Sequence, residues 1–115
     1  MFNAPNRSFI AAVDLPIAVR VKLTATLNEV TLAGATDDFI GVTETPRAAG
    51  KAVSIRLKNS SGTVRIVAGG AFAYGATVYG VAAGKVDDVP SGNVLAGTAL
   101  EAALSDGSQV EILLP

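Results

Sequence analysis

The sequence predicts an all-β protein, a small β-barrel or sandwich of short, mostly antiparallel strands. Apolar and polar side chains alternate along several segments, which is the period of a strand with one buried face. Turn residues separate these segments at short intervals, as in small barrels and sandwiches. Only residues 99–104 resemble a helix, and flanking glycines leave room for little more than a turn or two. With 115 residues, the chain has the size of one domain.

Four segments carry the alternation: residues 17–24, 53–58, 64–66 and 110–114. Each places an apolar residue at every second position. Because successive side chains of a strand point to opposite sides, each segment is expected to have a core face and an outer face.

Turn-forming residues divide the chain between these segments. Residues 59–62 (Asn-Ser-Ser-Gly) lie between two alternating segments and therefore predict a β-hairpin. The alanine pairs 48–49 and 82–83 each lead into Gly-Lys, which favours turns over helices. Further turns are expected at residues 14–16, 28–29, 33–34, 37–38, 69–70, 87–88, 90–93 and 106–107.

Two parts of the sequence resemble each other. In residues 40–44, an apolar-Gly-apolar stretch ends near a glutamate, and a glycine turn and an alternating segment follow over residues 49–55. Residues 96–101 and 106–112 repeat this order. Two copies are too few for a solenoid, so they predict two similar halves of one barrel. Chance similarity in a chain rich in alanine, valine and glycine is the alternative.

Charge is distributed unevenly along the chain. Residues 1–65 hold eight Lys or Arg against five Asp or Glu, whereas residues 66–115 hold one lysine against five acids. If the basic strands are neighbours, one side of the protein is basic. That side is either a solvated outer face or a docking face for an acidic protein surface, where charge steers association. The basic residues on predicted outer faces are Arg20, Lys22, Arg56, Lys58 and Arg65.

The composition argues against catalysis. The chain has no cysteine and no histidine, so it lacks thiolate nucleophiles, the usual general base and the commonest metal ligand. The adjacent acids at 37–38 and 87–88 point apart in an extended chain and are expected in solvated turns. Residues 80–86 and 50–52 lack the spacing of a phosphate-binding loop. We therefore expect a protein without enzymatic activity, cofactor, metal or small-molecule substrate.

Nucleic acid and membranes are also unfavoured as partners. The formal net charge is −1, and the aromatic residues Phe72, Tyr74 and Tyr79 lie away from the basic segments. We expect these aromatics in the core or at a subunit interface. Residues 66–84 carry no charge and are nearly long enough to span a bilayer, but their five glycines favour two buried strands. The first residues do not have the pattern of a signal peptide, so synthesis in the cytoplasm is expected.

Three groups of motifs carry a family resemblance over most of residues 17–114. The first is Phe-Ile-Gly-Val at 39–42, followed by residues 48–55. The second is Gly-Ala-Thr-Val-Tyr at 75–79, followed by residues 83–86. The third combines residues 95–101 with residues 107–114. In order and spacing, these motifs resemble the tailed-phage capsid cement family, small head-decoration proteins formerly classed as a domain of unknown function.

The resemblance implies a β-rich subunit without catalytic activity. Such a protein is expected on the outer surface of the virion, bound to the major capsid protein of an assembled phage head, where it reinforces the junctions between coat subunits. It implies a homotrimer at three-fold and quasi-three-fold positions, made in the host cytoplasm. Alternatives are another virion component, such as a head fibre base or tail-tube element, and a small β-type binding module for sugar or peptide.

The chain is expected to bury part of its surface against other chains. Half of its residues are apolar, and alanines and valines remain on the outer faces of the predicted strands. We predict that residues 1–8 form an extended N-terminal arm on a neighbouring subunit or the coat, and that residues 9–115 form a single β-domain. The predicted contacts of the arm are Phe2, Asn3, Pro5 and Arg7, beside the five basic residues of the strands.

Overall fold

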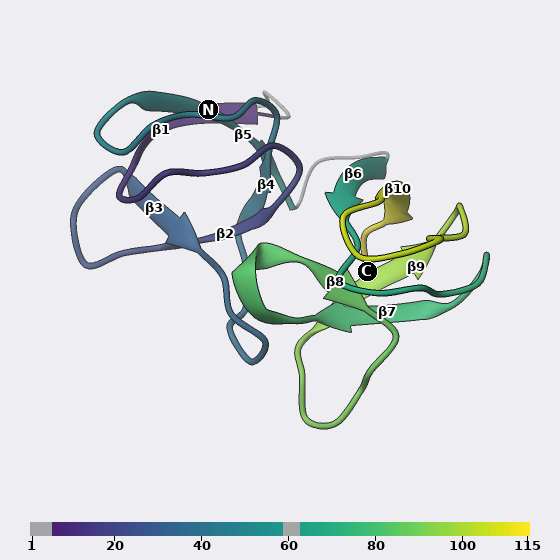
Figure 1. The fold of residues 1–115 in the computed structure, drawn as a ribbon. Coiled ribbons are helices and arrows are strands. Elements are labelled where there is room, and N and C mark those ends of the chain that lie inside the picture. The colour runs from purple at the N-terminus through teal and green to yellow at the C-terminus, as the bar shows by residue number, and fades with distance from the viewer. Residues whose placement is uncertain (1–5, 59–62) are drawn as a thin grey trace.

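The computed structural model describes residues 6–58 and 63–115, and this part of the chain is built from ten short strands without an α-helix (Figure 1). The all-β prediction is therefore confirmed. The helical reading of residues 99–104 is wrong, because Ala99 ends a strand and Ala103 forms a bridge to Phe72. The elements are β1 (Asn6–Ala11), β2 (Arg20–Leu23), β3 (Glu29–Leu32), β4 (Gly41–Thr43), β5 (Ala52–Leu57), β6 (Thr63–Val67), β7 (Thr77–Gly80), the 3-10 turn η1 (Ala82–Gly84), β8 (Val86–Asp87), β9 (Leu95–Ala99) and β10 (Gln109–Leu113).

The strands form two groups that follow each other along the chain. β1 to β5 make a closed barrel in the order β1-β3-β2-β4-β5, at the upper left of Figure 1. β6 to β10 make a second sheet in the order β6-β10-β9-β7-β8, at the right of the same view. A parallel bridge between Ala68 and Val86 joins the two ends of this second sheet. Apart from the parallel contact of β1 with β3, the strand pairs named here are antiparallel.

The two groups repeat one another in register, with an offset of 56 or 57 residues. All five pairs of β1 with β5, from Asn6↔Arg56 to Ile10↔Ala52, recur between β6 and β10. The pairing of β2 with β4 recurs between β7 and β9, and that of β2 with β3 recurs between β7 and β8. Even the bridge Leu15↔Arg47 has its equivalent, Phe72↔Ala103. The predicted similar halves are confirmed, with the difference that each copy forms a strand group of its own.

We call residues 6–57 the first half and residues 63–114 the second half. Their correspondence extends to single glycines in β4 and β9. A Cβ atom at Gly41 would lie 2.2 Å from the carbonyl oxygen of Arg56, and one at Gly97 would lie 2.2 Å from that of Leu113. Both positions therefore need glycine, because the neighbouring strand passes too close for any side chain. The glycines that suggested the repeat in the sequence thus have the same structural role in both copies.

The predicted hairpin around residues 59–62 is wrong. β5 pairs with β1 and β4, whereas β6 pairs with β10 in the other sheet. The connection therefore leads from the first half to the second instead of joining two neighbouring strands. Residues 59–62 themselves lie outside the described residues.

The core has two parts, and one of them crosses between the halves. The smaller cluster fills the barrel of the first half around Phe9, Val21 and Ile55. The larger cluster fills the second half and also contains Ala33, Phe39 and Val42 of the first half. Because apolar surface of the first half is buried by the second, the two halves stabilise each other.

The N-terminal strand overlaps the predicted arm. Asn6, Arg7 and Ser8 pair with Arg56, Ile55 and Ser54 as the first part of β1. The arm contacts predicted at Phe2, Asn3 and Pro5 lie outside the described residues. The arm over residues 1–8 and the single domain over residues 9–115 stay predictions, and residues 6–8 of that arm belong to β1.

Candidate interaction surfaces

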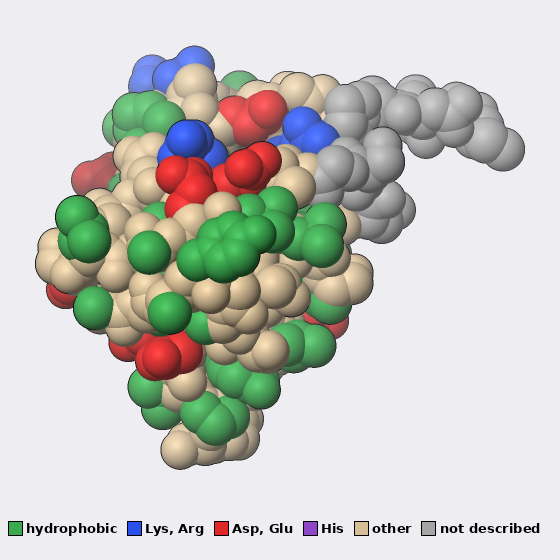
Figure 2. Space-filling view, turned by 90° about the vertical axis from the view of Figure 1, so that its right-hand side faces the viewer, with side chains coloured by type: hydrophobic (Ala, Val, Ile, Leu, Met, Phe, Trp, Pro, Cys, Tyr) green, Lys and Arg blue, Asp and Glu red, His purple; other side chains and the backbone are tan. Residues whose placement is uncertain are grey.

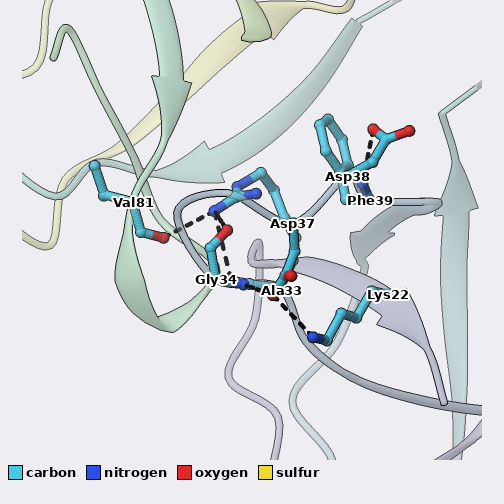
Figure 3. Close-up of polar contacts among 8 residues, drawn as sticks. Lys22, Ala33, Gly34, Asp37, Asp38, Phe39 and Val81 are labelled. Atoms are coloured by element: carbon cyan, nitrogen blue, oxygen red, sulfur yellow. Dashed lines mark hydrogen bonds and ion pairs between the residues drawn. The ribbon is translucent and has the colours of Figure 1, made fainter. Parts of the chain in front are cut away.

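The predicted outer position of Arg20 is wrong. This residue begins β2, and its side chain is fully buried. Its Nη2 donates to the carbonyl oxygens of Val81 at 2.8 Å and Gly34 at 3.3 Å, both of which Figure 3 labels. Its Nε donates to the carbonyl oxygen of Lys85 at 3.1 Å. The start of β2 is covered because the segment around η1, from the second half, lies over Arg20.

The buried guanidinium of Arg20 is held by backbone oxygens from both halves. Burial lowers the pKa of Arg20 to about 10, while the negative charge of Asp37 opposes this shift. Its carbon Cζ also lies 5.5 Å from the ring centre of Phe39, which is within the range of a cation–π contact. Arg20 therefore joins the two halves, and its buried side chain is not exposed for contact with a capsid.

Lys22 and Lys58 are on the surface, but each is paired with an acid. Lys22 Nζ lies 2.8 Å from Asp37 Oδ2, and Lys58 Nζ lies 2.7 Å from Asp38 Oδ1. Hydrogen bonds from these two lysines are the main reason why the pKa values of Asp37 and Asp38 lie below their usual range. Lys58 also lies 4.5 Å from the ring centre of Phe39. The adjacent acids at 37–38 are thus partners of lysines.

Arg56 and Arg65 both line a groove between the two halves. The groove has a volume of about 250 Å³ and is lined from one side by β4 and β5 and from the other by β6. Arg65 lies 3.4 Å from Glu101 and donates to the carbonyl oxygen of Gln109. Glu44 also lines the groove, and hydrogen bonds from Asn6 and Ser54 lower its pKa. The groove therefore carries side chains of both charges.

Arg7 is exposed on β1 at the open end of the barrel. Its guanidinium carbon lies 4.6 Å from the ring centre of Phe9, and its Nη2 donates to Asn28 Oδ1 at 2.6 Å. Taken together, the predicted basic residues do not form one continuous basic face. One is buried, and Lys22, Lys58 and Arg65 lie beside carboxylates.

Residues 6–58 and 63–115 contain no group of three or more acidic side chains placed to hold a metal ion. No helix in this part of the chain is long and apolar enough to cross a membrane.

Exposed apolar side chains are a feature that the sequence patterns did not locate. Leu27 and Leu104 are each 87% exposed, and Tyr74 is 74% exposed, whereas the neighbouring aromatic Phe72 is buried. Figure 2 shows hydrophobic side chains gathered on the face that the second half presents, next to acidic and basic ones. Tyr74 is thus not in the core, and the expected subunit interface remains as its alternative position. The correspondence between the two halves is the signal that identifies the positions of Leu27 and Tyr74.

Comparison with solved structures identifies the fold. The N base of the head fibre of bacteriophage phi29 matches with a TM-score of 0.76 and 16% identity, over 96% of this chain and 92% of that chain. At this identity the likeness concerns the fold alone. No curated protein matches the sequence closely enough to count as a relative.

The sequence itself matches a family of virion components. The family described as phage cement protein matches residues 13–114, which is nearly the whole chain and covers the three groups of motifs. This match confirms the resemblance stated from the sequence, and the family is one of structural phage proteins without enzymatic activity. On this ground, the chain belongs to the phage cement protein family.

Proposed function

We infer that the protein binds the outer surface of an assembled phage capsid and that it reinforces the junctions between coat subunits as a homotrimer. The observation that carries this proposal is the family match over residues 13–114. The structure is compatible with it, because the described residues offer exposed apolar side chains and a groove between the halves for contact with a partner.

The physical mechanism is linkage between binding and assembly. A protein that binds the assembled shell, and not free coat subunits, stabilises the shell by RT ln(1 + [L]/Kd). This amounts to about 2.7 kcal/mol per site at a hundredfold excess over Kd. Many sites on one shell act together, and a trimer binds more tightly than its subunits because its second and third contacts form at high effective concentration.

The proposed contacts with the coat protein are residues 2–5, Arg7 and the groove lined by Arg56 and Arg65. Two arginines and one glutamate line the groove, together with apolar and uncharged residues. An acidic side chain of the coat protein would meet two guanidinium groups there, and Arg65 would exchange its contact with Glu101 for the new carboxylate. Lys22 and Lys58 are secondary contacts, since they lie closer to their carboxylate partners, at 2.8 and 2.7 Å, than Arg65 does to Glu101 at 3.4 Å.

The test is to mix the purified protein with undecorated heads. We expect it to co-sediment with heads at saturating stoichiometry, to stay in the supernatant with unassembled coat subunits, and to raise the temperature at which heads release DNA. Heads that are equally stable with and without the protein contradict the proposal. Absence of co-sedimentation at micromolar concentration contradicts it as well.

A second candidate is the base of a head fibre, and the structural neighbour from phage phi29 favours it. In that case the protein anchors a longer appendage instead of sealing coat junctions. The two functions differ in the number of copies bound to each head and in their effect on the stability of the shell. A cement protein occupies equivalent sites across the whole shell and stabilises it, whereas a fibre base leaves the stability of the shell unchanged.

A further inference from the structure

The two halves of the chain are joined by an interface of apolar side chains and backbone hydrogen bonds. On the first half, this interface includes Ala33, Phe39 and Val42, which lie in the core cluster of the second half. The backbone N–H of Val67 donates to the carbonyl oxygen of Ala18 at 2.7 Å, and that of Gly84 donates to Ala33 at 3.0 Å. The second half thus packs onto the first through β6 and the segment around η1.

The positions equivalent to this interface are open on the second half. By the register of the repeat, Ala33 corresponds to Val89 and Phe39 corresponds to Leu95. Ala33 and Phe39 are buried, whereas Val89 and Leu95 are each 44% exposed. Two residues that line the groove between the halves, Ile17 and Arg56, correspond to the exposed Tyr74 and Leu113. We call this set the trailing surface: Tyr74, Val89, Leu95 and Leu113.

The first half in turn exposes the positions that correspond to the second half's side of this interface. Val67 and Gly80 of the second half touch the first half: Val67 through its bond to Ala18, and Gly80 against the guanidinium of Arg20. Their equivalents are Ile10 and Leu23, which are exposed. The segment around η1 follows β7, and the loop that follows β2 in the same way carries the exposed Leu27. We call this second set the leading surface: Ile10, Leu23 and Leu27.

These two surfaces account for most of the exposed apolar side chains. They hold seven of the ten large apolar residues that are exposed in the described part of the chain. Apolar residues thus gather where the repeat would continue in both directions, beyond the second half and before the first. Such contiguous exposure marks an interaction site in a soluble protein.

We propose that a second copy of this chain docks its leading surface onto the trailing surface of the first, and so repeats between chains the packing of the two halves within one chain. This inference rests on the self-association included in the proposed function, and not on capsid binding. The two surfaces differ, so the contact is heterologous and joins chains in one direction. Closure of such contacts produces a ring, and three chains produce a ring of six halves.

Charge favours the same arrangement. The first half, residues 6–57, holds six Lys or Arg against five Asp or Glu, whereas the second half, residues 63–114, holds two against five. Contacts between the first half of one chain and the second half of the next therefore bring opposite net charges together. Two first halves or two second halves would bring like charges together, which disfavours a symmetric pairing through either half alone.

The contact between chains is weaker than the contact within a chain. The N–H of Ile10 already donates to Asn28, so the backbone bond made by Val67 is not repeated. Thr77 stands where the first half has Arg20, so the buried guanidinium has no counterpart. We therefore expect an association that depends on concentration and relies on apolar side chains.

The test compares variants in solution by sedimentation equilibrium. Leu95→Asp places a charge on the trailing surface and Leu27→Asp places one on the leading surface, and each should raise the dissociation constant at least about tenfold. Leu104→Asp is the matched control, because Leu104 is equally exposed but lies on neither surface. Thermal unfolding of each variant shows that the fold is retained.

Mixing the variants distinguishes the heterologous contact from others. Leu27→Asp and Leu95→Asp chains each retain one intact surface, so the mixture should form a one-to-one dimer and nothing larger. Wild-type protein that stays monomeric at high concentration overturns the inference, and so does equal association of Leu95→Asp and Leu104→Asp. Monomers that still bind heads overturn it while leaving capsid binding intact. Oligomers that ignore heads support it and contradict the proposed function.

Discussion

Nη2 of Arg20 lies 2.8 Å from the carbonyl oxygen of Val81, and this bond connects the first half of the chain to the second. Arg20 has the same place in β2 as Thr77 has in β7, so only one of the two halves carries the buried cation. A fully buried guanidinium needs several acceptors, and the backbone oxygens around η1 supply them. The repeat is therefore symmetric in its strands but not in the contacts between its halves.

Substitution of Arg20 is expected to destabilise the protein strongly. Arg20→Met removes the hydrogen bonds to Val81, Gly34 and Lys85 and takes from the Val81 carbonyl oxygen its Arg20 donor, which together costs about 2–3 kcal/mol. Lys22→Met is the matched control in the same strand. Its ion pair with Asp37 is partly exposed and contributes less than about 1 kcal/mol. Urea unfolding measures both, and equal stability of the two variants would refute the joining role of Arg20.

Neither of the two equivalent glycines is expected to tolerate a side chain, and Gly97 also has a φ of +151°, which adds strain in its variant. Gly41→Ala and Gly97→Ala each force a methyl group against a backbone oxygen, and each should lower the free energy of unfolding by about 3 kcal/mol. Gly107→Ala is the comparison, since its φ is +95° but no atom lies within 4 Å of the added Cβ. That variant should lose about 1 kcal/mol through backbone strain alone. A similar loss at all three positions would contradict the role of the close strand approach.

Acid is expected to weaken the fold through Asp37, Asp38 and Glu44. The pKa of each is lowered in the folded protein, mainly by side-chain hydrogen bonds from Lys22, Lys58 and Asn6 respectively. A carboxyl group with a depressed pKa contributes stability that is present above its unfolded pKa and is lost as pH falls through the folded one. The melting temperature should therefore fall below about pH 4.5, where the unfolded state begins to bind more protons.

Glu44→Gln provides the check on this pH dependence. The amide cannot titrate, so the variant should start from a lower stability at pH 7 and lose less between pH 7 and pH 2.5. Thermal unfolding across this range measures the effect. A pH profile parallel to that of the wild type would show that Glu44 does not contribute.

Truncation of the N-terminus separates the arm from β1. Removal of residues 2–5 leaves every β1 pair in place, so binding to heads should weaken while the unfolding temperature stays the same. Removal of residues 2–8 also deletes Arg7 and Ser8 with their pairs to Ile55 and Ser54, and should destabilise the barrel. Unchanged head binding after the shorter truncation would refute the arm as a contact.

Local patterns in the sequence predicted much of the fold. The alternation in residues 53–58 and 110–114 identified β5 and β10, because the period of two follows directly from strand geometry. The similarity of residues 40–55 and 96–112 indicated the repeat, and the structure places Gly41 and Gly97 in matching pairs. The lack of histidine and cysteine pointed away from catalysis without any knowledge of the fold.

The surfaces were harder to predict. Alternation separates the two faces of a strand, but it does not show whether a second layer covers the outer one. Arg20 and Lys22 illustrate this limit, since one is buried under η1 and the other is paired with Asp37 on the surface. The turn residues at 59–62 were equally ambiguous, because the same composition suits a hairpin and a crossing between two sheets.

The sequence by itself determined that this is an all-β chain with two similar halves and without histidine or cysteine, since strand period, glycine placement and composition are local properties. Only the tertiary structure decided which strand faces are covered, which basic side chains form ion pairs with carboxylates, and where apolar side chains are exposed to solvent. Those outcomes depend on how the second half packs against the first, and that packing brings together residues far apart in the chain.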